Sequence, residues 1–190
     1  METLRRIVYV MFRPKAEWEL IAEEKTSVDA LLRGYILPLA LLAPIATVIG
    51  MKIFDREWDP MHGYLVPPGD IFAAGAATFF AIVGSIFALA AIFALIAPMF
   101  GSPRNFLAAL KVATYGAIPV LLAGATLVLP AMAIVGMVGL CHTLFLYWLG
   151  VHQVLKVPTG GSAEYVGISI VLLALVSAFA GAAGSAISLL

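Results

Sequence analysis

Long stretches without a charged residue constrain this chain more strongly than any other feature of its sequence. No Asp, Glu, Lys or Arg occurs between Lys111 and Lys156, and none follows Glu164. The hydrocarbon core of a bilayer is about 30 Å thick, and roughly 20 apolar residues cross it as a helix. Uncharged runs of this length are typical of membrane-spanning segments, so the chain is expected to contact the lipid bilayer directly.

The composition excludes several other classes of protein. Of the 190 residues, 63% are hydrophobic and 12% are charged, whereas a soluble domain carries about 25% charged residues. A soluble enzyme, a disulfide-rich secreted module and a disordered protein are therefore disfavoured. Lys+Arg and Asp+Glu balance at 11 each, so no net positive field favours a nucleic-acid partner. Cys141 is the single cysteine, which excludes an intramolecular disulfide.

Five apolar segments are expected to cross the membrane as helices, because backbone polar groups cannot stay unpaired in hydrocarbon. They cover residues 30–53, 71–100, 106–129, 131–151 and 165–189. The predicted fold is all-α: a polytopic integral membrane protein whose five transmembrane helices form a domain over residues 30–190. Residues 1–29 are expected to form a short cytoplasmic region of amphipathic, interfacial helices ahead of this domain.

The charged residues concentrate in this N-terminal region, where 12 of the 22 lie within the first 33 residues. Apolar residues at helical spacing, with Arg5 and Arg6 opposite them, predict a first helix on the membrane surface. These apolar residues are Leu4, Ile7, Val8 and Met11. Pro14 opens a second short helix, and three of its side chains are expected to anchor it at the membrane interface: Trp18, Leu20 and Ile21. The alternative is a charged, partly ordered tail.

The distribution of Lys and Arg predicts the orientation of the spans, because these residues favour the cytoplasmic side. With five spans, the N-terminal region shares one side with the 101–105 and 152–164 loops. That side carries nine Lys and Arg residues, whereas the other carries only Lys52 and Arg56. The N-terminus is therefore expected in the cytoplasm and the C-terminus on the outside.

Small residues line three of the spans and predict how the helices pack, because helices in lipid associate through close contact. The stripes are Ala74, Ala77, Ala81, Gly84, Ala88 and Ala91 in the second span, Gly136, Gly139 and Thr143 in the fourth, and Ala174, Ser177, Gly181, Gly184 and Ser188 in the fifth. We expect these three spans to form the tight interior. The alternatives are that Ala-rich helices produce such stripes by chance, or that the stripes join copies of a homo-oligomer.

Two ionisable residues within the spans are candidate functional residues, and each has two interpretations. Lys111 lies about one turn into the third span, where a lysine usually extends its ammonium to the interface. Alternatively, Lys111 lines a pathway or joins Arg104 in holding an anionic lipid head group. His142 lies near the membrane midplane and is either a neutral structural histidine or a proton or ion relay.

No pattern in the sequence indicates catalysis or a bound metal. The 54–70 loop gathers three acids and a histidine: Asp55, Glu57, Asp59 and His62. Their spacing matches no EF-hand or zinc pattern, so a solvated loop is favoured over a weak metal site. Because no nucleophile elbow, P-loop, zincin helix or dinucleotide fingerprint occurs, we expect no catalytic residues, no cofactor and no metal.

Several short motifs together resemble a known family. Ahead of the spans stands the pattern Pro-x-x-x-Trp-x-x-Ile, formed by Pro14, Trp18 and Ile21. The first span contains Tyr35-Ile-Leu-Pro38, the third contains Tyr115-Gly116-Ala-Ile-Pro119, and the fourth ends with aromatic residues and Gly150. This combination resembles the Yip1 domain family, small five-span proteins with a cytosolic N-terminus, and the resemblance covers essentially the whole chain.

The resemblance also implies a function and a location. Eukaryotic Yip1 proteins are linked to Rab-type GTPases in the Golgi and endoplasmic reticulum, and they carry a long polar N-terminal region with an Asp-Leu-Tyr-Gly-Pro element. This chain has only residues 1–29 there and no good copy of that element, which favours the short type of the bacterial inner membrane. The predicted function is a non-catalytic scaffold whose protein partner docks on the N-terminal tail. The alternative is a transporter or channel for a small ion or lipid that uses the kinked first and third spans and His142.

Overall fold

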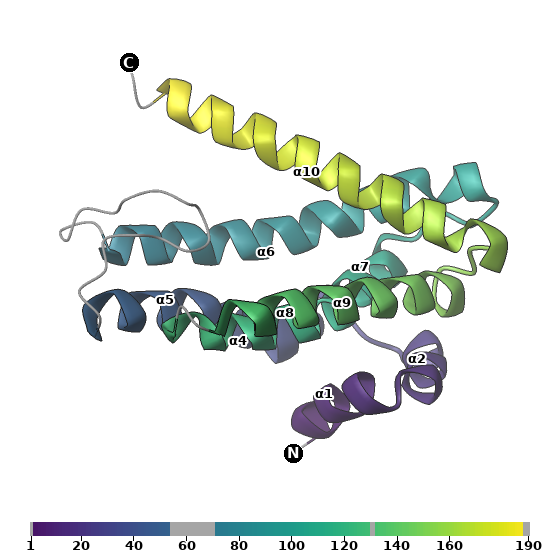
Figure 1. Ribbon diagram of the computed structural model, residues 1–190. Helices are drawn as coiled ribbons and strands as arrows, with labels where there is room; N and C mark the ends of the chain where they lie inside the picture. Colours follow the sequence, from purple (N-terminus) through teal and green to yellow (C-terminus); the bar gives the residue numbers. More distant parts are fainter. Residues whose placement is uncertain (1, 54–70, 130–131, 188–190) are drawn as a thin grey trace.

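The computed structural model describes residues 2–53, 71–129 and 132–187, and the regular elements in these ranges are all helical (Figure 1). Five helical segments there are long and apolar enough to cross a membrane. They are Val28–Ile53, Ile71–Phe100, Phe106–Val128, Ile134–Gln153 and Thr159–Phe179. The predicted all-α, polytopic membrane fold is therefore confirmed.

The N-terminal region folds as a helical hairpin of α1 (Glu2–Phe12) and α2 (Pro14–Glu23). Pro14 occupies the first turn of α2, where its missing N–H has no partner to lose. The hairpin packs against the flank of the transmembrane helices (Figure 1), and Val10, Trp18 and Ile21 belong to the same hydrophobic core as those helices. Trp18 and Ile21 are fully buried, so they anchor the hairpin to protein. The expectation that these two side chains lie at the membrane interface is therefore wrong.

The first span is irregular around its prolines. It consists of α3 (Val28–Leu31), the π-helical turn η1 (Leu32–Ile36), α4 (Leu37–Ala40) and α5 (Leu42–Ile53). Pro38 has no N–H for the carbonyl of Gly34, and its ring crowds that carbonyl. The widened π turn directly before Pro38 accommodates this clash, and it contains Tyr35.

The third span is also broken next to a proline, Pro119, although without a π turn. Helix α7 (Phe106–Gly116) ends just before Ala117, and α8 (Ile118–Ala123) and the 3₁₀ turn η4 (Gly124–Val128) follow. The break releases the backbone N–H of Val120, which donates to Thr143 Oγ1 at 3.2 Å. Thr143 lies on the neighbouring helix α9 and is buried, so a side chain replaces the backbone acceptor at the kink.

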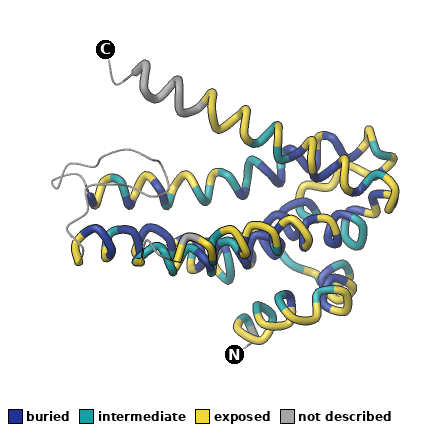
Figure 2. Tube along the Cα trace, viewed as in Figure 1, coloured by how far each residue is buried: buried dark blue, intermediate teal, exposed yellow. Residues whose placement is uncertain are grey.

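The remaining spans are longer helices. Helix α6 (Ile71–Ile96) ends in the 3₁₀ turn η3 (Ala97–Phe100), α9 covers Ala133–Gln153, and the turn η6 (Thr159–Gly161) leads into α10 (Ser162–Ile187). Of these helices, α6 and α9 pack against the third span, and α10 packs against α6 and α9. Gly101 closes η3 with a φ of 73°, a left-handed conformation that suits glycine. Helix α10 stays close to the bundle near its start and then diverges from α6, and its residues 174–179 are exposed (Figures 1 and 2).

The interior of the bundle differs from the one we expected from the small-residue stripes. Of the most apolar 18-residue stretch in each span, 72% is buried in the third span, against 39% in the second, 33% in the fourth and 22% in the fifth. Ala81 and Gly84 of α6, two residues of the expected interior, are exposed. The broken third span lies at the centre of the bundle. Its kink places both of its halves against neighbouring helices.

Replacing Thr143 with valine tests the role of this residue at the kink. Valine preserves the shape but leaves the Val120 N–H unpaired, and a buried unpaired donor destabilises by about 1–3 kcal/mol. We expect the thermal unfolding midpoint in detergent to fall by about 2–4 °C per kcal/mol. Thr143→Ser keeps the hydroxyl and should retain most of the stability. A valine variant as stable as the wild type would contradict this interpretation.

Candidate functional site

The candidate residues from the N-terminal motif and the spans meet where the hairpin packs on α7 and α9. Trp18 of α2 lies against Gly150 of α9, where an added Cβ would come within 2.8 Å of the indole ring. On its other side, the Trp18 ring meets Tyr115 of α7 edge to face, with 6.5 Å between ring centroids. Gly150 is therefore the residue that lets the largest side chain of the hairpin enter the core.

Tyr115 is the centre of this aromatic packing and is fully buried. Its ring also meets Tyr35 of the π turn edge to face, at 4.9 Å between centroids. The next residue, Gly116, faces Tyr147 of α9, and an added Cβ would lie 2.3 Å from that ring. Edge-to-face pairs of this kind stabilise beyond the area they bury, so four of the candidate residues (Trp18, Tyr35, Tyr115 and Gly116) form one packed unit.

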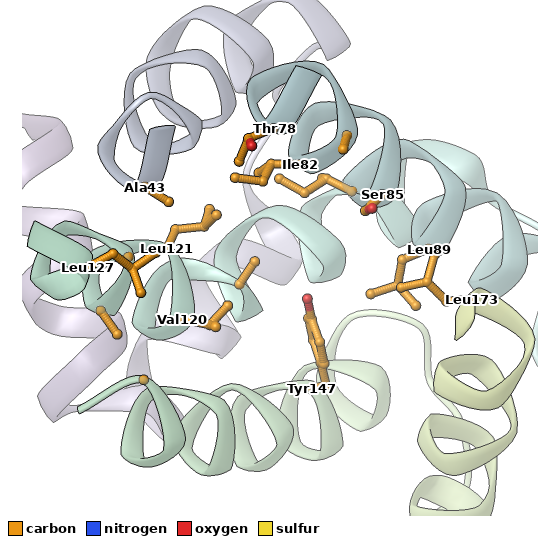
Figure 3. Close-up of a pocket in the computed structure, with 16 residues that line it drawn as sticks. Ala43, Thr78, Ile82, Ser85, Leu89, Val120, Leu121, Leu127, Tyr147 and Leu173 are labelled. Atoms are coloured by element: carbon orange, nitrogen blue, oxygen red, sulfur yellow. The ribbon is translucent and has the colours of Figure 1, made fainter. Parts of the chain in front are cut away.

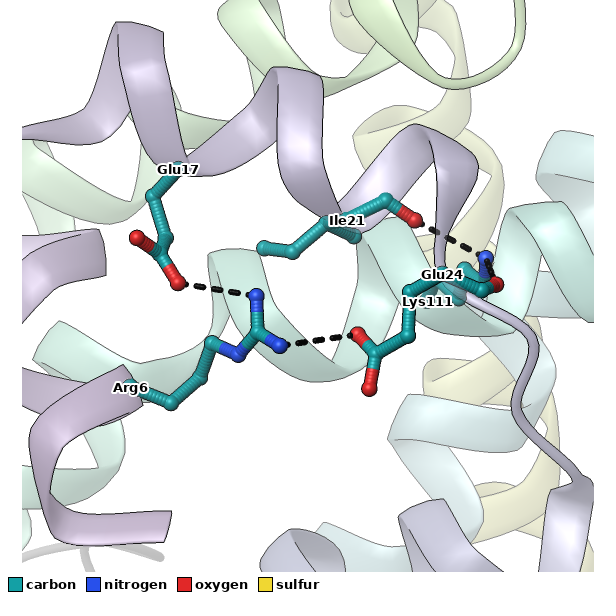
Figure 4. A network of polar contacts seen from close by, with 5 residues as sticks. All are labelled: Arg6, Glu17, Ile21, Glu24 and Lys111. Atoms are coloured by element: carbon teal, nitrogen blue, oxygen red, sulfur yellow. Dashed lines mark hydrogen bonds and ion pairs between the residues drawn. The ribbon is translucent and has the colours of Figure 1, made fainter. Parts of the chain in front are cut away.

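Lys111 follows neither of the two interpretations proposed from the sequence. Its Nζ donates to the backbone carbonyl of Ile21 at 2.8 Å and to that of Glu24 at 2.5 Å (Figure 4). These carbonyls lie at the C-terminal end of α2, where carbonyl groups lack helical partners and the helix dipole is negative. Lys111 is 6% exposed, so its ammonium fastens the hairpin and is not available to a lipid head group beside Arg104.

Arg6 links the two helices of the hairpin next to Lys111. Its Nη1 lies 2.8 Å from Glu17 Oε1, and its Nη2 lies 3.3 Å from Glu24 Oε2 (Figure 4). Desolvation by burial lowers the pKa of Arg6, but the carboxylates of Glu24 and Glu17 outweigh it and raise the pKa above its ordinary value. Glu24 contacts Arg6 through its side chain and Lys111 through its carbonyl, which joins α1, α2 and α7 in one polar network.

Sequence reasoning missed this network because it placed Arg6 on the solvent side of the first helix. A signal was present: Glu17 and Glu24 are seven residues apart, so they share one face of α2. That face can only be assigned to the bundle once the direction of Trp18 is known. Thr143, treated as one member of a small-residue stripe, was likewise not recognised as a partner of the kink.

His142 lies apart from the aromatic and polar network. It lines a separate pocket of about 270 Å³ between α8, α9 and Met11 of α1. Its Nε2 is buried without a hydrogen-bond partner among the described residues, and its ring meets Phe145 at 6.1 Å between centroids. Pro119 lines the same pocket, whose other described side chains are apolar except Thr126. A relay function of His142 thus stays a prediction.

A larger cavity of about 490 Å³ lies between α6, the third span, α9 and α10 (Figure 3). Its lining is aliphatic apart from three hydroxyl groups, those of Thr78, Ser85 and Tyr147. Thr78 donates to the carbonyl of Ala74 at 2.9 Å, and Tyr147 donates to that of Ala113 at 3.4 Å. The cavity is thus suited to hydrocarbon rather than to an ion.

The small residues predicted to pack helices have different positions. Ala81 and Gly136 line the larger cavity, and a Cβ added at Gly84 or Gly136 would meet nothing within 4 Å. Gly139 does lie at a helix contact, because an added Cβ would be 2.8 Å from Ala123 Cβ. Gly181 and Gly184 lie on α10, in the part for which side-chain burial is not described. The 54–70 loop lies outside the described residues. Pro38 lies exposed at the kink of the first span.

In the described part of the chain, no group of three or more His, Cys, Asp or Glu residues is placed to hold a metal ion. The three acids and the histidine of the 54–70 loop lie outside this part. The charged side chains of Arg6, Glu17, Glu24 and Lys111 are engaged in contacts between the hairpin helices and α7, so the site described here is a docking arrangement between helices.

Comparison with known proteins assigns the chain to a family. The model of the Yip1 domain matches residues 8–181. The chain belongs to the Yip1 family. No curated protein and no solved structure matches it. The match begins within α1 and includes α2 and the five spans, so the docked hairpin is part of this Yip1 domain and not an appended tail.

Removing the Lys111 ammonium tests whether it fastens the hairpin. Lys111→Met keeps the aliphatic stem and removes the donors to both α2 carbonyls. A hydrogen bond to a charged group is worth about 1.5–3 kcal/mol, so amide hydrogen exchange in α2 should become at least about tenfold faster. Exchange in α6 should stay unchanged. The matched control is Lys156→Met, on the exposed connection after α9. Unchanged exchange in α2 of Lys111→Met would refute the role.

A double-mutant cycle tests the contact between Trp18 and Gly150. Gly150→Ala places a methyl group against the indole and should destabilise by about 1–3 kcal/mol through overpacking. Trp18→Phe makes room, so the double variant should be more stable than the sum of the single effects predicts. Gly160→Ala is the control, because an added Cβ there meets nothing within 4 Å. Additive effects on the unfolding midpoint would exclude direct coupling.

Proposed function

We propose that this Yip1-domain protein is a non-catalytic membrane scaffold of the short bacterial type, located in the inner membrane. The observation that carries the proposal is the docking of the hairpin: Lys111, Arg6 and Trp18 hold one side of it on the bundle. Its other side is thereby presented to solvent in a fixed orientation. A preorganised surface binds a partner without first being ordered.

The outer face of α2 is the proposed docking surface for a protein partner. Trp18 and Ile21 point into the bundle, whereas Leu20 is 58% exposed. Glu19 and Glu23, on the same side of α2, are also exposed. An apolar side chain surrounded by charged residues is a typical arrangement of an interface anchor with a polar rim. The carboxylates favour a partner with a basic complementary surface.

The alternative function as a transporter or channel is supported less well. It relies on the kinked first and third spans together with His142. The larger cavity lies against these spans, but His142 lines the other pocket. The described lining of the larger cavity carries hydroxyl groups and no charged side chain, which does not favour an ion pathway.

We further propose that the N-terminal hairpin lies on the cytoplasmic side. The hairpin, the connection after η3 and the connection after α9 lie near one end of the bundle, and α10 runs toward the other end (Figure 1). Nine of the 11 Lys and Arg residues belong to the hairpin side.

Ala81 and Gly84 are exposed and are proposed as contacts to a second copy if the protein forms homo-oligomers.

Reporter fusions at Leu190 test the proposed orientation. An alkaline phosphatase fusion should be active and a green fluorescent protein fusion dark, because only the former folds on the outside. A fusion at the N-terminus should give the opposite pattern. A fluorescent C-terminal fusion would place both ends on one side and overturn the orientation.

Site-specific photocrosslinking tests the docking surface. A photoreactive amino acid in place of Leu20 should give one discrete protein adduct in intact cells. The matched control is Leu175 on α10, which is 51% exposed but lies in a membrane span, and it should give no such adduct. The adduct should also disappear in the Glu19→Lys/Glu23→Lys background. Identical patterns at positions 20 and 175, or no adduct at position 20, would refute the scaffold proposal.

A further inference from the structure

Three cations of the N-terminal hairpin are exposed to solvent. Arg6 is the cation of α1 that pairs with acidic side chains, through Glu17 and Glu24. Arg5, Arg13 and Lys15 are exposed, and no ion pair involves them among the described residues. The hairpin therefore presents concentrated positive charge beside the membrane-spanning helices.

A tyrosine gathers two of these cations on one stripe of α1. The guanidinium carbons of Arg5 and Arg13 lie 5.9 Å and 6.0 Å from the centroid of the Tyr9 ring. Cation–π contacts of this kind hold a guanidinium in place while its N–H groups remain free to donate. Next to this basic stripe, α1 carries an apolar stripe of exposed side chains: Leu4, Val8 and Phe12.

The basic stripe ends at a groove between the hairpin turn and α9. The groove, of about 410 Å³, is lined by Arg13, Pro14, Lys15, Ala16 and Phe145. Phe145 is half-exposed and stacks on Trp148 with 6.2 Å between centroids. Both aromatic side chains belong to the lipid-facing surface of α9. The groove therefore has a cationic wall from the hairpin and an aromatic wall from a spanning helix.

The groove lies between the hairpin turn and a membrane-spanning helix, so its cations stand beside the lipid that surrounds α9. Exposed tryptophan residues such as Trp148 concentrate at the membrane interface. Phe145 lies three residues earlier on α9, within the same membrane-spanning segment. Cations beside lipid need an anionic partner, because an unpaired charge near hydrocarbon is unfavourable. The positive end of α2, which begins at Pro14, adds a field of the same sign.

We propose that this groove binds the phosphate of an anionic membrane phospholipid. Arg13 and Lys15 contact the phosphate oxygens, with the planar guanidinium suited to two parallel hydrogen bonds. Phe145 contacts the first part of an acyl chain, which is why the occupant is a lipid and not a soluble phosphate. The site is distinct from the Arg104 and Lys111 pair considered from the sequence, since the Lys111 ammonium is occupied by carbonyls of α2. It is also independent of the proposed partner surface on α2.

Native mass spectrometry of the full-length protein in a neutral detergent tests the proposal. Phosphatidylglycerol should bind, and phosphatidylcholine with the same acyl chains should bind much more weakly. The Arg13→Gln/Lys15→Gln variant should bind phosphatidylglycerol roughly thirtyfold more weakly, given the contribution of two basic residues. The charge-matched control is Lys25→Gln/Arg104→Gln, which changes two exposed cations elsewhere and should stay within about twofold of the wild type. Equal binding by the first variant and the wild type, or equal loss in both variants, overturns the site.

A second comparison separates a lipid from a soluble phosphate. Phe145→Ala should weaken phosphatidylglycerol binding, and glycerol 3-phosphate at the same concentration should not displace the lipid. If glycerol 3-phosphate competes equally well, or if Phe145→Ala has no effect on lipid binding, the lipid assignment is wrong. The unfolding midpoints of all variants, measured in parallel, identify any that fail to fold. Since Phe145 is half-exposed, conservative Phe145→Leu provides a folded comparison that should retain most of the lipid binding.

Discussion

A lysine inside a membrane span must find hydrogen-bond acceptors, and the rest of this structure follows from how Lys111 finds them. Its ammonium reaches the carbonyls of Ile21 and Glu24 at the end of α2. The helix end thus satisfies the lysine, and the lysine satisfies carbonyls that α2 itself leaves unpaired. Neither group is well solvated alone, so the hairpin and the bundle stabilise each other. The N-terminal segment is therefore part of the folded Yip1 domain.

Packing around this contact depends on a few positions where a side chain is absent. Gly150 makes room for Trp18, and Gly116 makes room for Tyr147. Two prolines contribute differently, since Pro38 follows a π turn and Pro119 lies in the first turn of α8, just after the break at Ala117. These breaks turn Tyr35 and Tyr115 toward each other. Trp18, Tyr35, Tyr115 and Gly116 thus lie together where the hairpin packs on the kinked third span.

The functional consequences arise from the surfaces that this docking leaves exposed. The face of α2 with Leu20 is turned outward and acidic, whereas the turn around Arg13 and Lys15 is basic and borders the lipid-facing side of α9. One short hairpin thereby carries both the proposed partner surface and the proposed lipid groove. A scaffold that connects a partner to anionic membrane requires both.

The sequence by itself determined the membrane fold and its five spans, because charge-free apolar runs have no other stable arrangement. Its resemblance to the Yip1 family also marked Trp18, Tyr35, Tyr115 and Gly116 as candidate residues. It did not determine their contacts, and the expected interior of the second, fourth and fifth spans was wrong. Small residues permit close approach between helices, but they do not determine which helix packs against them. Only the tertiary structure decided that Lys111 binds α2, that Arg6 pairs with Glu17 and Glu24, and that Thr143 completes the kink, because each contact joins two different helices.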